Sequence, residues 1–175
     1  MKVRAMVTTL AASLLFAGAA LAAETGWKTY GNSQAGFAVE MPGEAKMSTQ
    51  KSKSGDLYRL ESHVGNVGYH VISWDGQVDL SGSEHARNLD FMRRAILGCH
   101  HATAQSEREL ELNGFPGLEI TFRDGKLGTH WVTRIYLVKS YCYEVSTEST
   151  VAGTSADGTR FFNSFHPELK TPAAA

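Results

Sequence analysis

LYRLESHVGNVGYHVISW, residues 57–74, is the stretch that decides the fold. Two segments that read as strands, Leu57–Val64 and Val67–Trp74, flank the dipeptide Gly65-Asn66. A two-residue connection of this kind favours a tight β-hairpin and fixes its register. The register sets Glu61 opposite His70 and predicts four further pairs: Val64 with Val67, Ser62 with Tyr69, Leu60 with Val71, and Tyr58 with Ser73.

The two faces of this hairpin differ in character. One face is mostly apolar, whereas the other carries the five residues that we expect to form a partner-binding surface: Arg59, Glu61, His63, His70 and Trp74. That face combines charge with tryptophan, a residue enriched at binding sites. The alternative is that a helix covers Ile72 and Trp74 and leaves a solvated rim in which Glu61 pairs with His70.

Further strands are expected on both sides of the hairpin. They are Trp27–Tyr30, Phe37–Met41, Ser106–Leu112, Leu118–Arg123, Lys126–Val138 and Tyr141–Thr147. Their connections are short, which implies antiparallel pairing because parallel crossovers need a dozen or more residues. The polar run 46–55 lacks periodicity and is expected to be a loop.

Two helices complete the predicted elements. Ser81 and Glu84 have capping-box spacing, and apolar residues then recur at helical spacing up to a C-cap at Gly98. That apolar stripe is Leu89, Met92, Ile96 and Cys99. Thr154 to Asp157 can cap a second helix whose apolar face carries Phe161, Phe162 and Phe165. The predicted fold class is therefore α+β, an antiparallel β-sheet packed by helices.

The N-terminus predicts export. Basic residues at Lys2 and Arg4 precede a charge-free apolar run, and Ala20-Leu21-Ala22 suits a signal peptidase. The run is shorter than the roughly 20 residues of a membrane-spanning helix, so an uncleaved anchor is the weaker alternative. We expect a signal peptide over 1–22 and one domain over 23–175, with a core at about 27–167 and a disordered tail. The mature chain would be periplasmic or extracellular, with no transmembrane segment.

Charge argues against a nucleic-acid partner. The chain has 17 basic and 18 acidic residues, and loss of Lys2 and Arg4 would leave 15 basic residues and a net charge near −3. The charges are scattered, and no basic stripe is present to neutralise phosphates.

Cysteines and histidines raise two questions. In an exported chain, Cys99 and Cys142 are most simply a disulfide, with two buried free thiols as the alternative. Cys99-His100-His101 and the diagonal pair His63 and His70 contain metal-ligand types, but neither pattern has the spacing of a recognised metal motif. We therefore expect no metal and no cofactor.

No catalytic signature is present. The sequence lacks a nucleophile elbow, a zinc-protease motif, a phosphate loop and a dinucleotide fingerprint. We expect that the protein is not an enzyme, although a hydrolase with a scattered site stays open.

Several short motifs carry a family resemblance. They are Gly36 to Gly43 after Tyr30, Gly114 to Glu119, Arg134 to Val138 with Tyr141 to Tyr143, and Arg160 to Phe165. In this order the chain from Trp27 to Phe165 resembles small exported bacterial proteins with the PsbP-like fold. The resemblance implies an α/β/α sandwich, and the better-known members act by docking rather than catalysis. Fold alone does not give function.

The leading expectation is an exported, non-catalytic binding or accessory module of the cell envelope that docks on an unidentified envelope protein. A carrier of a small apolar ligand or lipid is the first alternative. It would need a cavity, which the sequence cannot show.

Overall fold

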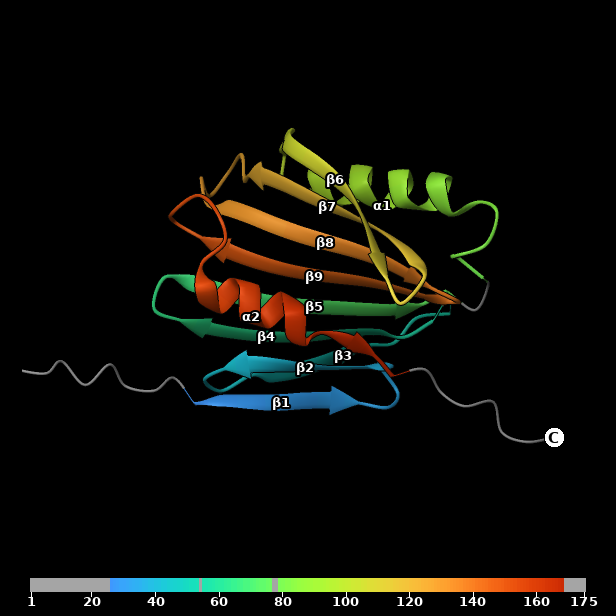
Figure 1. Cartoon of the computed structure of the whole chain (residues 1–175), viewed down its shortest axis with the longest axis horizontal. Helices are drawn as coiled ribbons and strands as arrows, with labels where there is room; N and C mark the ends of the chain where they lie inside the picture. Colours follow the sequence, from blue (N-terminus) through green and yellow to red (C-terminus); the bar gives the residue numbers. More distant parts are fainter. Residues whose placement is uncertain (1–25, 54, 77–78, 169–175) are drawn as a thin grey trace, which may run out of the picture.

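Seven antiparallel strands form the main sheet of the computed structural model, in the order β3-β4-β5-β9-β8-β7-β6 (Figure 1). They are β3 (Lys46–Gln50), β4 (Leu57–Val64), β5 (Val67–Asp75), β6 (Ala104–Leu112), β7 (Phe115–Arg123), β8 (His130–Val138) and β9 (Tyr141–Ser149). The structure describes residues 26–53, 55–76 and 79–168, so the predicted signal peptide and the tail from residue 169 lie outside the described residues. The predicted α+β class is confirmed.

The hairpin of β4 and β5 has the predicted register. Val64 pairs with Val67 and Glu61 pairs with His70, as do the other predicted partners. Strand β5 then pairs with β9, which lies more than sixty residues later in the chain. The hairpin is therefore built into the sheet through its second strand.

One face of the main sheet is covered by a small sheet and a helix. The small sheet has the order β1-β2-β10, formed by Trp27–Asn32, Phe37–Pro42 and His166–Pro167. Helix α2 (Ala156–Ser164) begins as predicted, because the Ser155 side chain accepts a hydrogen bond of 3.0 Å from the backbone N–H of Gly158. The buried residues that join these layers include Phe37, Val39, Met41, Phe161, Phe162 and Phe165.

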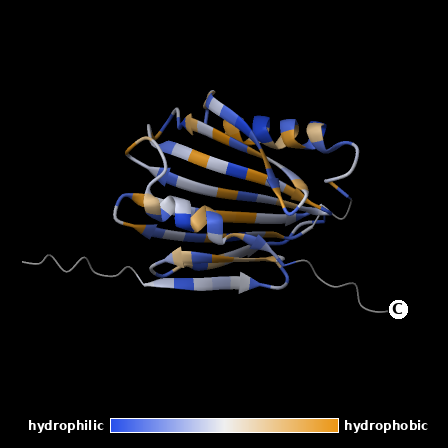
Figure 2. Cartoon of the chain, in the orientation of Figure 1, coloured by the Kyte–Doolittle hydropathy of each residue, from blue (hydrophilic) through white to orange (hydrophobic). Residues whose placement is uncertain are grey.

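The other face of the sheet is covered by helix α1 (His85–Cys99), and only in part. Its buried residues Ile96 and Leu97 pack in a second core with Ile120, Phe122 and Ile135 of β7 and β8. Hydrophilic and hydrophobic turns alternate along the helix (Figure 2). Since α1 lies over β7 and β8, the β4–β5 half of this face extends beyond it.

The ends of α1 differ from the prediction. The helix starts at His85, and no side chain caps it, because Ser81 Oγ instead hydrogen-bonds Asp79 and the backbone N–H of Lys139. At the other end it runs past Gly98, and His101 takes the positive φ of 48° that glycine usually supplies after a helix.

Two short strands were not predicted. The run 46–55 includes strand β3, which is fully exposed along its length and therefore shows no apolar alternation. Strand β10 has only two residues and pairs with β2.

Candidate functional site

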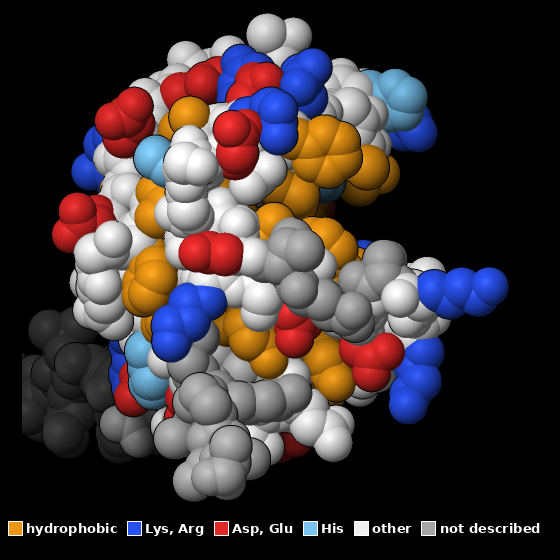
Figure 3. Space-filling model, turned by 90° about the vertical axis from the view of Figure 1, so that its right-hand side faces the viewer, with side chains coloured by type: hydrophobic (Ala, Val, Ile, Leu, Met, Phe, Trp, Pro, Cys, Tyr) orange, Lys and Arg blue, Asp and Glu red, His pale blue; other side chains and the backbone are white. Residues whose placement is uncertain are grey.

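A groove runs beside α1, where the helix stops short of β5 and β4. Hydrophobic side chains border the hollow that opens on this side of the molecule (Figure 3). Its first part has a volume of about 400 Å³ and is lined mainly by Leu57, Ile72, Trp74, Phe91, Met92 and Glu144. A second part of about 330 Å³ shares Ile72, Met92 and Glu144 and adds Arg59, Glu61, His70 and Trp131. The two parts form one groove with an apolar end and a polar end.

Strand alternation places the apolar floor of the groove. Ile72 and Trp74 are two residues apart on β5, so both point to the α1 face. They pair with Glu144 and Cys142 of β9, which share that face. From the helix, Phe91 adds a ring that is 63% exposed, one of the few large apolar side chains left in solvent.

Among the described residues that line the apolar end, Glu144 is the one carboxylate. It lies between Ile72 and Ile135 in the sheet and accepts a hydrogen bond of 3.2 Å from Ser146 Oγ. Burial raises the pKa of this carboxyl group above its ordinary value. A group of this kind favours a ligand that donates a hydrogen bond or carries a positive charge.

The predicted partner surface lies on this face, spread along the groove. Arg59, Glu61 and His70 line the polar end, where Glu61 Oε1 is 3.5 Å from Arg59 Nη1 and 3.7 Å from His70 Nδ1. Trp74 is half-buried at the apolar end, and His63 is exposed beyond His70. The alternative, in which a helix covers Ile72 and Trp74, is met only in part, because α1 packs against Trp74 from one side and leaves both residues half-buried.

Three residues of this face were not singled out from the sequence. Glu144 and Glu148 lie on β9, and only the long-range pairing of β5 with β9 brings them beside the hairpin. Phe91 falls outside the apolar stripe of α1. A large apolar side chain in that position could have indicated an exposed binding residue from the sequence.

The predicted disulfide is wrong: Cys99 and Cys142 are both free. Cys142 is buried beside Phe91 and Met92 of the helix. Cys99 is exposed and stands at least seven residues further along α1, which corresponds to roughly 10 Å of helix. The helical spacing pointed Cys99 toward the sheet, whereas Leu97 takes the buried position.

Cys99, His100 and His101 do not converge on a metal. His100 Nδ1 lies 2.7 Å from Asp124 Oδ2, Cys99 faces the groove, and His101 is exposed after the helix. Among the described residues, one group of His, Cys, Asp and Glu brings at least three ligand atoms together: His63, His70 and Glu148.

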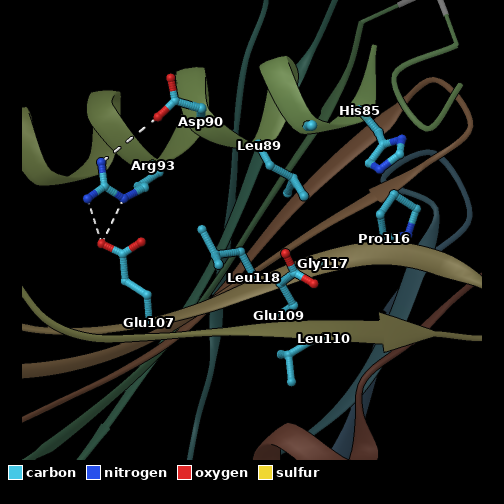
Figure 4. Close-up of a pocket in the computed structure, with 11 residues that line it drawn as sticks. His85, Leu89, Asp90, Arg93, Glu107, Glu109, Leu110, Pro116, Gly117 and Leu118 are labelled. Carbon is cyan, nitrogen blue, oxygen red and sulfur yellow. Dashed lines mark hydrogen bonds and ion pairs between the residues drawn. The ribbon is translucent and has the colours of Figure 1, made fainter. Parts of the chain in front are cut away.

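A second hollow lies on the opposite side of α1, toward β6 and β7. Its volume is about 380 Å³, and its walls include Leu89, Arg93, Glu107 and Leu118 (Figure 4). Arg93 crosses it to bind Glu107, with Nε 2.8 Å from Oε1, and its guanidinium also lies 3.9 Å from Asp90. Because these ion pairs tie the helix to the sheet, this hollow is the weaker candidate for a ligand.

Comparison with solved structures supports the α+β fold, whereas comparison with sequence families finds no match. No protein-family model matches the sequence, and no curated protein matches it. The solution structure of cyanobacterial PsbP (CyanoP) from Synechocystis is similar, with a TM-score of 0.55 and 13% identity over 82% of this chain and 93% of that one. A Bacteroides thetaiotaomicron protein aligns with a TM-score of 0.43 and 12% identity, over 80% of this chain and 48% of that one.

The chain therefore has a PsbP-like α+β fold. At 13% identity the likeness to cyanobacterial PsbP concerns the fold alone. In the described part of the chain, no helix has the length and apolar character needed to cross a membrane.

Proposed function

We propose that this protein is an exported, non-catalytic binding module of the cell envelope. Its ligand is a small, mostly apolar molecule that carries a hydrogen-bond donor and lies in the groove beside α1. The observation that carries the proposal is the open apolar groove left where α1 stops short of β5, with a half-buried carboxylate on its floor.

The size and lining of the groove suit such a ligand. Its apolar end measures about 400 Å³, and small-molecule sites typically have volumes of about 300–1,000 Å³ with apolar walls and a few polar groups. Trp74, Phe91 and Met92 offer flat or adaptable apolar surface. Glu144 supplies the polar contact that would orient the molecule.

Export and the absence of catalysis rest on the sequence. The basic start, the apolar run and Ala20-Leu21-Ala22 support secretion. Established catalytic motifs are missing from the chain.

The polar end of the groove, with Arg59 and Glu61, can contact polar atoms of the ligand or an envelope protein that delivers the ligand.

A fluorescence titration with N-phenylnaphthylamine, an apolar probe with one N–H donor, tests the proposal. We expect saturable binding that Phe91→Ala weakens about tenfold, because burying a Phe side chain contributes about 1.5–3 kcal/mol. Leu127→Ala is the matched control: Leu127 is 72% exposed and lies outside the groove.

Equal affinity in Phe91→Ala and Leu127→Ala would contradict the groove as the binding site. Absence of saturable binding, together with capture of an envelope protein that Trp74→Ala abolishes, would assign this face to protein docking.

A further inference from the structure

The side chains of His63 on β4, His70 on β5 and Glu148 on β9 meet at the exposed end of the same sheet face. His63 and Glu148 flank Gly68 of β5 in one row across the sheet, and His70 lies two residues after Gly68. One ligand atom from each of His63, His70 and Glu148 lies within 4.8 Å of the others.

Gly68 leaves the space in which these groups converge. A Cβ atom at this position would lie 2.7 Å from His70 Nε2 and 3.0 Å from His63 Nε2. Both imidazole nitrogens therefore point at one spot above the glycine. His70 Nε2 is also 3.7 Å from Glu148 Oε2, close to the ligand–ligand separation of about 3.4 Å expected around a tetrahedral zinc ion.

The packing around His70 holds its ring in place. Its ring stacks on Trp131, with centroids 5.2 Å apart, and its side chain is only 13% exposed. Within the described residues its buried Nε2 atom has no hydrogen-bond partner, and such an atom calls for an explanation.

The other ring nitrogen of His70 faces an outer carboxylate. Glu61 Oε1 lies 3.7 Å from Nδ1, on the side away from Glu148. Metal-bound histidines commonly direct their second nitrogen to such a carboxylate, which orients the ring.

We propose that His63, His70 and Glu148 bind a divalent transition metal ion of the zinc class. Two imidazoles and one carboxylate match the ligands that zinc takes, and three protein ligands leave one position for water or a donor atom from another molecule. The exposed side chain of His63 lets the site close around the ion by rotation. This inference replaces the expectation of no metal site, and it stands whether or not the groove binds an apolar ligand.

Isothermal titration of the untagged chain with Zn²⁺ tests the site. The expected result is one ion per chain, with affinity reduced at least tenfold in His63→Ala and in Glu148→Gln. Gly68→Ala removes no ligand but fills the space with a methyl group, so it should also lower the affinity. Glu61→Gln should cost about tenfold through the outer carboxylate.

His166→Ala is the matched control, because His166 is exposed on β10 and distant from the cluster. Co²⁺ in place of Zn²⁺ should give the strong visible bands of a tetrahedral site, and these should vanish in His63→Ala. Circular dichroism melting checks that each variant is folded. Failure of the wild-type chain to bind one Zn²⁺, or equal affinity in His63→Ala and His166→Ala, would overturn the proposal.

Discussion

His100 Nδ1 lies 2.7 Å from Asp124 Oδ2, and this contact joins the end of α1 to the turn after β7. The second carboxylate oxygen of Asp124 accepts hydrogen bonds of 2.7 Å from the backbone N–H groups of Lys126 and Leu127. The hydrogen bond from Leu127, followed by that from His100, lowers the pKa of Asp124 to about 2. Because α1 is one wall of the groove, this carboxylate holds that wall in place.

Asp124→Asn should lower the free energy of unfolding at neutral pH by about 1–2 kcal/mol, since charged hydrogen bonds are lost. The folded pKa lies below the ordinary value of 3.8, so the stabilisation is complete above about pH 4 and disappears as the pH falls toward 2. Urea unfolding at a series of pH values measures this. Asp90→Asn, at an exposed site on α1, is the control. A difference between Asp124→Asn and wild type that persists unchanged at pH 2 would contradict the assignment.

Glu144→Gln should raise the stability of the folded chain at neutral pH, whereas Asp124→Asn lowers it. Burial raises the folded pKa of Glu144, so the folded chain holds this proton more tightly than the unfolded chain does, and stability falls as the pH rises through that range. The neutral amide avoids the cost of desolvating a charge at this half-buried position. The variant should therefore melt at a higher temperature than wild type at neutral pH, and the gap should close in acid. A lower melting temperature at neutral pH would show that the charged form of Glu144 is stabilised in the fold.

Phe161→Ala should cost about 3–5 kcal/mol, because a fully buried ring would be replaced by a cavity. Phe161 packs edge-on against Tyr69, with ring centroids 5.4 Å apart, and fastens α2 to the sheet. Chemical denaturation measures the loss. Val151→Ala, at a position 65% exposed, should change stability by less than about 0.5 kcal/mol.

The thiols should differ sharply in reactivity. Cys99 is exposed, whereas burial raises the pKa of Cys142 to about 12. Since the thiolate is the reactive form, a disulfide-exchange reagent such as Ellman's should label one thiol in the native chain and two in denaturant. Labelling of neither thiol in denaturant without reductant would show that the two cysteines are bonded after all.

Local patterns predicted the elements whose partners are close in the chain. The Gly65-Asn66 turn fixed the register of β4 with β5, and Ser155 marked the start of α2. Strand β3 was missed because its exposure on both faces removes the alternation on which such a prediction rests. The start of α1 was misplaced because Ser81 Oγ binds Asp79 instead of the helix.

The candidate site depends on contacts between residues far apart in the sequence, which local sequence patterns do not predict. The hairpin face with Arg59, Glu61 and His70 was predicted from the sequence. Its neighbours Glu144 and Glu148 were not, because they reach this face only through the pairing of β5 with β9, which local spacing does not encode. The groove exists because α1 lies over β7 and β8 and leaves Ile72 and Trp74 half-covered. That placement is set by side-chain packing across the whole face, including Ile96 against the second core.

Amide and indole chemical-shift mapping with N-phenylnaphthylamine tests the central claim most directly. The proposed groove predicts that shifts concentrate at Ile72, Phe91, Met92, Glu144 and the Trp74 indole, while Leu127 and Val151 stay unmoved. Shifts confined to the small sheet and α2, or scattered over exposed apolar residues that include Leu127, would contradict a ligand site beside α1.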